Sequence, residues 1–118
     1  MKYAVLIYES PEQLARDPQD PESAAYWGAY AAYTEALVKA DVMAGGEGLE
    51  PPHTAATVRL KDGAPVVQDG PFADTHEQLG GFYLIEAEDR DAALAWAARC
   101  PAADGGAVEV RPVMVMDA

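Results

Sequence analysis

Side chains that could do chemistry gather in the segment 68–81, between two predicted strands. The segment holds four ionisable side chains: Asp69, Asp74, His76 and Glu77. Loops that join rigid strands commonly carry binding and catalytic groups. A carboxylate at the end of a strand, such as Asp69, becomes a general base when it is partly withdrawn from water. An Asp before Gly-Pro also commonly accepts backbone N–H bonds from the following turn, so the residue pattern leaves both roles open for Asp69.

A second candidate group lies in the segment 108–115, which is predicted to form the last strand. Glu109 and Arg111 alternate with valines there, so both side chains point to the same face. An acid and a guanidinium in a mostly apolar cleft need partners, either in each other or in a ligand. We therefore predict either a substrate-binding pair or a structural ion pair at an interface. The residues expected to approach the same cavity from neighbouring strands are Tyr8, Glu9 and Tyr83.

The residue pattern gives less support to a metal-binding site or to a catalytic cysteine. His53 and His76 are the two histidines, and no recognised metal-ligand spacing surrounds them, so both are expected in solvated loops. The single cysteine, Cys100, ends an apolar helical pattern beside Pro101, which favours a small core residue over a nucleophile. The sequence therefore predicts neither a metal nor another cofactor.

Composition and charge exclude several classes of partner. The 118 residues include 20 Asp and Glu against 8 Lys and Arg, a formal net charge of −12. Without a basic cluster, neither nucleic acid nor an anionic membrane surface is an expected partner. No segment has the signal-peptide pattern or the ~20 apolar residues of a membrane helix, so a cytoplasmic location is expected. The length predicts a single domain over residues 1–118.

Apolar periodicity and turn residues predict the elements that must position these side chains. Residues 11–21 are polar and rich in proline, which is typical of a loop. Asp62-Gly63 joins two β-rich runs and is typical of a hairpin with a type I′ turn. Helices are expected over 22–41 and 91–100, with Asp20 and Asp89 at their starts. Strands are expected over 2–8, 54–60, 64–69, 79–87 and 108–115.

The first predicted helix carries an aromatic stripe. Tyr26, Tyr30, Tyr33 and Leu37 are spaced by four, three and four residues, which places them on one helical face. Such a stripe is more often part of the core than of a ligand-binding wall, and the core interpretation is the one we favour here.

The order of elements predicts an α+β domain with a ferredoxin-like βαββαβ core and an added hairpin. Two helices can cover one face of such a sheet. The first strand is nevertheless apolar on both faces, and Phe82 and Leu84 alternate with Tyr83 and Ile85 rather than with charges. The simplest way to bury the uncovered face is a second copy packed sheet to sheet, in a homodimer with two-fold symmetry.

Asp69-Gly70-Pro71-Phe72, followed by the run 77–87, resembles the signature of the DGPF proteins, a branch of the YCII-related superfamily. Segments 2–8, 45–49 and 109–113 extend the resemblance over most of the chain. The resemblance implies a dimeric α/β-barrel of ferredoxin-like topology, related to muconolactone-isomerase-like enzymes. Some members are encoded beside extracytoplasmic-function sigma factors. The His–Asp pair associated with the YCII branch does not carry over, because the predicted helix 22–41 contains no histidine.

Together these features predict a small homodimer that binds an organic small molecule in a cleft between the sheet and the segment 68–81. Asp69 is the predicted base for an isomerase- or lyase-type proton transfer. The predicted substrate-binding residues are Tyr8, Glu77, Tyr83, Glu109 and Arg111. Two alternatives stay open: a non-catalytic regulatory or binding module that acts with a sigma factor, and a purely structural role for the motif in folding and dimerisation.

Overall fold

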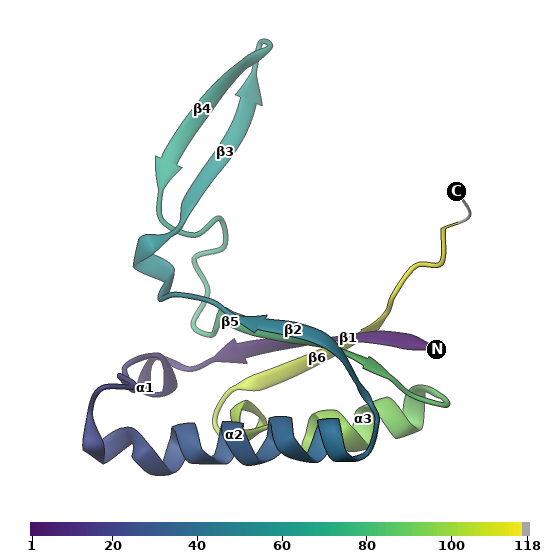
Figure 1. Ribbon diagram of the computed structural model, residues 1–118. Coiled ribbons are helices and arrows are strands. Elements are labelled where there is room, and N and C mark those ends of the chain that lie inside the picture. The colour runs from purple at the N-terminus through teal and green to yellow at the C-terminus, as the bar shows by residue number, and fades with distance from the viewer. Residues whose placement is uncertain (117–118) are drawn as a thin grey trace.

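The structure is a computed structural model that describes residues 1–116, so the last two residues of the predicted domain 1–118 lie outside the described part. Its helices and strands follow one another along the chain as shown in Figure 1. They are β1 (Lys2–Glu9), α1 (Pro11–Leu14), α2 (Ala24–Lys39), β2 (Met43–Gly48), β3 (Ala56–Lys61), β4 (Ala64–Asp69), β5 (Gln78–Glu86), α3 (Arg90–Ala98) and β6 (Ala107–Pro112).

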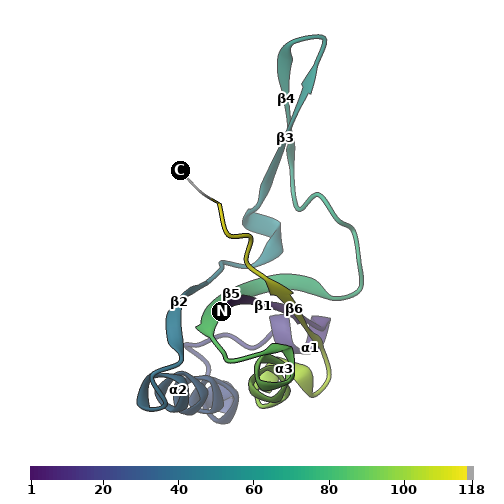
Figure 2. The same ribbon diagram turned by 90° about the vertical axis from the view of Figure 1, so that its right-hand side faces the viewer.

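Four strands form one antiparallel sheet in the order β2-β5-β1-β6. This is the strand order of a ferredoxin-like core, and it confirms the predicted fold class. Helices α2 and α3 lie side by side on one face of the sheet (Figure 2). Neither α2 nor α3 covers the opposite face, which is called the open face below. As an edge strand, β6 accommodates Pro112, which cannot donate a ladder hydrogen bond.

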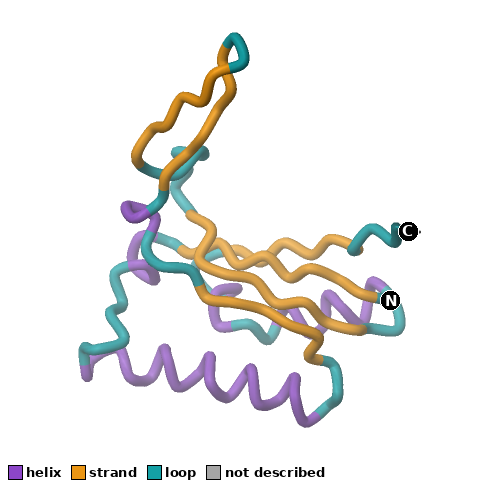
Figure 3. Tube along the Cα trace, turned by 45° about the horizontal axis from the view of Figure 1, so that its top comes forward, coloured by secondary structure: helices purple, strands orange, loops and turns teal. Residues whose placement is uncertain are grey.

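Strands β3 and β4 form a separate hairpin, called the arm below, which stands away from the sheet on the side of the open face (Figures 1 and 3). Asp62 and Gly63 both have positive φ, at 52° and 80°, which confirms the predicted type I′ turn. The arm makes the molecule extended: its radius of gyration is 16.0 Å. A compact chain of this length has a radius of gyration of about 13–14 Å.

The core lies between the sheet and the two helices. Alternate β1 residues, Tyr3, Val5 and Ile7, point into it, and Leu37 of α2 is fully buried against them. Cys100 is buried there too, which confirms it as a core residue. Among residues 1–116, no helix is long and apolar enough to cross a membrane.

The loop predicted over residues 11–21 is partly wrong, because Pro11–Leu14 forms one helical turn. Ser10 and Gln13 make a capping box: the Gln13 N–H donates to Ser10 Oγ at 3.2 Å, and the Ser10 N–H donates to Gln13 Oε1 at 2.8 Å. The Ser-x-x-Gln spacing is the sequence signal for this turn. The Gln13 amide nitrogen also donates to the backbone oxygen of Asp104 at 2.9 Å, which ties α1 to the segment before β6.

We expect Gln13→Ala to lower the free energy of unfolding by about 1–3 kcal/mol, because it leaves buried backbone groups without partners. Urea unfolding followed by circular dichroism measures this change. Glu12→Ala is the matched control, since Glu12 is the exposed neighbour in the same turn. Equal stability of the two variants would contradict the bridging role of Gln13.

Candidate functional site

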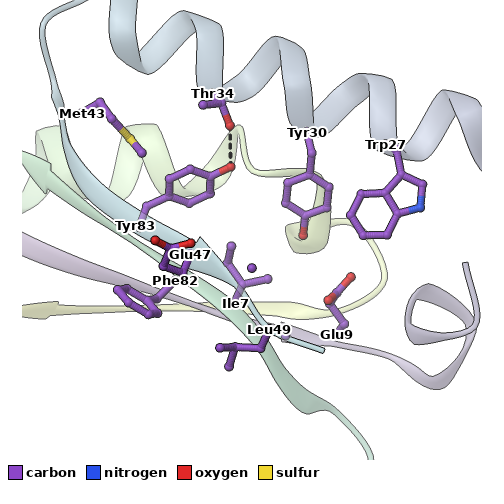
Figure 4. Close-up of a pocket in the computed structure, with 14 residues that line it drawn as sticks. Ile7, Glu9, Trp27, Tyr30, Thr34, Met43, Glu47, Leu49, Phe82 and Tyr83 are labelled. Carbon is purple, nitrogen blue, oxygen red and sulfur yellow. Dashed lines mark hydrogen bonds between the residues drawn. The ribbon is translucent and has the colours of Figure 1, made fainter. Parts of the chain in front are cut away.

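A cavity of about 320 Å³ lies between α2 and the edge of the sheet formed by β2 and β5; we call it the α2 cavity. Trp27, Tyr30 and Thr34 reach into it from α2, and Glu9 and Tyr83 point toward them from the sheet (Figure 4). Glycines 46, 48, 80 and 81 form part of its wall. The cavity exists because β2, which faces the start of α2, is rich in glycine and offers few side chains to fill the space.

Two carboxylates line the α2 cavity: Glu47, which is exposed, and Glu9, which is buried. Glu9 continues the inward alternation of the apolar β1 residues that enter the core, and its exposed fraction is 8%. The Tyr26 hydroxyl donates a hydrogen bond to Glu9 Oε2. Among residues 1–116, Oε1 has no hydrogen-bond partner and no cation forms an ion pair with Glu9. Since no fully buried side-chain oxygen there lacks a partner, Oε1 is in contact with solvent.

Aromatic side chains from α2 stand around this carboxylate. The Trp27 and Tyr30 ring centroids lie 5.9 Å apart, and the Tyr26 ring meets Tyr30 edge-on at 5.2 Å. The Trp27 indole N–H donates to the backbone oxygen of Arg16 at 3.1 Å, which fixes the ring. Burial raises the pKa of Tyr26 and of Tyr30, and the hydrogen bond to Glu9 raises that of Tyr26 further. Both phenols therefore stay protonated near neutral pH and act as hydrogen-bond donors.

The far end of the cavity holds a hydroxyl pair. Thr34 Oγ1 and Tyr83 Oη lie 2.7 Å apart (Figure 4), and Met43 lines the wall beside them. Burial raises the pKa of Tyr83 above its ordinary value. The cavity thus offers an acceptor carboxylate at one end, neutral hydroxyls at the other and aromatic walls between them.

A second cavity of about 350 Å³ adjoins the α2 cavity. Glu9, Trp27 and Leu49 line both, so Glu9 lies at the junction. Arg16 lines the second cavity, and its guanidinium carbon lies 5.1 Å from the centroid of the Tyr26 ring, a cation–π contact.

The open face carries the second predicted group. Glu109 and Arg111 share this face, as predicted, and form an ion pair with each other. The strand register places Tyr8 on the same side, whereas Tyr83 faces the helices. Because alternate residues of a strand point to opposite faces, Tyr8 and Tyr83 cannot contact one ligand within a single chain. This corrects the expectation that they share a cavity.

Asp69 and Glu77 lie away from the α2 cavity. Asp69 is exposed at the end of β4, at the base of the arm, and Glu77 directly precedes β5. The turn after Asp69 is held by the Gly70 N–H, which donates to the backbone oxygen of Ala55 at 2.7 Å. Of the side chains predicted to form the site, Tyr83 and Glu9 line the α2 cavity, and Tyr8, Asp69, Glu77, Glu109 and Arg111 do not.

Trp27, Tyr30 and Thr34 were not predicted as site residues. The aromatic stripe splits along α2: Tyr33 and Leu37 are buried in the core, whereas Tyr26 and Tyr30 are half-buried beside the cavity. The sequence signal for the site was Glu9, an acid at the inward position that follows three apolar inward residues. No group of three or more His, Cys, Asp or Glu side chains within residues 1–116 is arranged to hold a metal ion.

The ferredoxin-like sheet and its added arm agree with the sequence pattern of a known family. The chain belongs to the family of YCII-related domains, which matches residues 1–117. An uncharacterized protein of Rhizobium meliloti (strain 1021) is 37% identical over 115 residues, which cover 96% of this chain and 92% of that protein.

The fold also resembles a solved structure, that of 5-chloro-2-hydroxyhydroquinone dehydrochlorinase (TftG) from Burkholderia phenoliruptrix AC1100 in complex with 2,5-dihydroxybenzoquinone. The TM-score is 0.54 and the sequence identity is 18%, over 97% of this chain and 94% of that chain. At this level of sequence identity, the similarity supports a shared fold alone.

Proposed function

We propose that this YCII-related protein binds a small, hydroxylated ring compound in the α2 cavity and that Glu9 accepts a proton from it. The observation that carries the proposal is the buried Glu9 carboxylate, with one oxygen held by Tyr26 and the other without a partner among residues 1–116. Oε1 is in contact with solvent, and a ligand hydroxyl that displaces this water can donate a charge-assisted hydrogen bond to it in a partly desolvated setting.

The surrounding groups suit proton transfer of the isomerase or lyase type. A general base must lie within hydrogen-bond reach of the proton it removes; Glu9 lines the α2 cavity, and its Oε1 is in contact with solvent. The aromatic walls of Trp27 and Tyr30 suit a flat ring, and the volume falls within the range of about 300–1,000 Å³ typical of small-molecule sites. The quinone bound to TftG, a distant relative in fold, supports hydroxylated rings as the first probes.

Isothermal titration with hydroquinone and with methylhydroquinone, two rings whose hydroxyls are uncharged near neutral pH, tests the binding proposal. We expect saturable binding with one ring per chain. Proton transfer is followed by NMR, as exchange of ring hydrogens for deuterium that is faster with protein than in buffer. Heats that match dilution alone for both compounds would contradict the proposal.

The charge around the two cavities predicts discrimination against anionic ligands. Four acidic residues line them, Glu9, Asp17, Glu47 and Glu50, with Arg16 as the cationic side chain of the lining residues. Like-charge juxtaposition costs up to several kcal/mol, so gentisate, which is hydroquinone with a ring carboxylate, should bind at least ~10-fold more weakly than hydroquinone. Competition titrations at low and high salt measure the ratio of the two affinities, which should approach one as the salt concentration rises, because salt screens the charges. Tighter binding of gentisate than of hydroquinone would contradict this prediction and would show that the positive charge of Arg16 dominates the electrostatic potential in the cavities.

We also propose that two copies pair through their open faces. Leu6, Phe82 and Leu84 leave an apolar strip there, and the arm adds exposed Val58, Leu60 and Val67 on the same side of the sheet. An isolated two-stranded hairpin is marginally stable in water, so the arm needs a surface to pack against. A second copy supplies that surface with two-fold symmetry.

In the proposed homodimer, most of the site residues that were predicted from the sequence lie at the interface or close to it. Tyr8, Glu109 and Arg111 would lie at the interface, with Glu77 and Asp69 at the base of the arm close to it. In this arrangement Asp69 could act as a base toward a ligand held between the copies. Within one chain, Glu9 is the carboxylate that we propose for the cavity.

A further inference from the structure

Gly80 lies where β5 departs from regular pairing with β1. Ile7 pairs with Gly81 and Tyr8 pairs with Leu79, so Gly80 is the extra residue of a β-bulge. Bulges commonly re-aim a side chain or the chain itself next to a functional site. Here the side chain that lies against the bulge is Glu9, at the end of the neighbouring strand.

The Glu9 carboxylate occupies the space that a side chain at residue 80 would need. A Cβ placed on Gly80 would lie 1.9 Å from Glu9 Oε1, 2.9 Å from Cδ and 3.3 Å from Cγ. We infer that Gly80 is a positioning residue: because it has no side chain, Oε1 of Glu9 can lie against β5 while the carboxylate lines the α2 cavity and accepts a hydrogen bond from Tyr26. This inference rests on the proposed role of Glu9 as the ligand-binding carboxylate.

Neighbouring glycines make contacts of a different kind. A Cβ on Gly81 would lie 2.8 Å from the backbone oxygen of Glu47, and one on Gly106 would lie 2.4 Å from that of Tyr8. Those two positions are constrained by backbone, so substitution there disturbs strand pairing. At Gly80 the three nearest atoms all belong to the Glu9 side chain, which can rotate to another rotamer. Gly80→Ala should therefore keep the fold and move the carboxylate away from Tyr26.

Hydroquinone titration compares Gly80→Ala with a control glycine substitution outside the cavity, Gly28→Ala. Gly28 is exposed on α2, lines neither cavity, and a Cβ there meets nothing within 4 Å. Losing a hydrogen bond to a charged group weakens binding by roughly 10- to 100-fold, so we expect that loss for Gly80→Ala and wild-type affinity for Gly28→Ala. In a Glu9→Ala background, Gly80→Ala should cause no further loss.

A second readout reports the position of the carboxylate without any ligand. Burial and the Glu9 hydrogen bond both raise the pKa of Tyr26. Displacing the carboxylate removes the second cause, so Tyr26 should form tyrosinate at lower pH in Gly80→Ala than in wild type or in Gly28→Ala. Spectrophotometric titration measures this, with Tyr26→Phe variants identifying the signal. An unchanged Tyr26 titration together with wild-type hydroquinone affinity would overturn the positioning role.

The two proposals fail in different ways. If wild type does not bind hydroquinone but Tyr26 still titrates earlier in Gly80→Ala, the proposed function is wrong and the positioning role holds. If Gly80→Ala does not fold, the double variant Glu9→Ala/Gly80→Ala should restore folding, because the added methyl then has space. Failure of that restoration would overturn the inference.

Discussion

Glu9→Gln should reduce hydroquinone affinity by roughly 10- to 100-fold and slow any protein-dependent ring-hydrogen exchange by about 10²- to 10⁴-fold. The amide keeps the shape of the side chain and still accepts the hydrogen bond from Tyr26, so the fold is retained. It cannot take up a proton and it lacks the charge that strengthens the bond to the ligand. Titration calorimetry and NMR exchange measure the two effects.

Asp69→Asn is the matched control for Glu9→Gln, because both replace a carboxylate by its amide. Asp69 is exposed and lines neither cavity that contains Glu9. We therefore expect hydroquinone affinity in Asp69→Asn to match wild type. A large loss in Asp69→Asn with none in Glu9→Gln would assign the base to Asp69, as the sequence hypothesis does.

Leu6→Glu should convert a homodimer into monomers. Leu6 lies on the open face, opposite Phe82 and Glu109 in the strand register. At a two-fold interface the substitution introduces a carboxylate from each copy into an apolar surface, next to Glu109. Burying unpaired charges costs several kcal/mol, so the dimer dissociation constant should rise by more than about 100-fold.

Light scattering over a concentration series measures the dimer. Val38→Glu is the control, because Val38 is an exposed apolar residue on α2, on the helix side of the sheet. We expect a dimer mass for wild type and for Val38→Glu, and a monomer mass for Leu6→Glu at the same concentration. A monomer mass for wild type at micromolar concentration would contradict the proposed interface.

Much of the fold could be predicted because local signals determine it. Asp62-Gly63 requires the positive φ angles of its turn, and the Asp89 side chain caps α3 by accepting from the Ala92 N–H at 2.8 Å. The strand β2 was harder to place, because half of its residues are glycines that carry no periodic signal. The topology required a strand there, but the residue pattern gave no boundaries for it.

The site was harder to predict for a related physical reason. Helical spacing identifies which residues share a face of α2, but it does not say how far the sheet extends beneath that face. Tyr33 lies over the sheet and is buried, whereas Trp27 and Tyr30 lie beside the glycine-rich edge, where a cavity remains. Asp69 was grouped with the sheet residues, because the sequence does not reveal that the arm stands away from the sheet.

The most direct test of the account is the crystal structure of the protein with bound hydroquinone. We predict that the ring lies in the α2 cavity against Trp27 and Tyr30, with one hydroxyl donating to Glu9 Oε1. A ring bound at the open face, beside Glu109 and Arg111 and without contact to Glu9, would contradict the central claim.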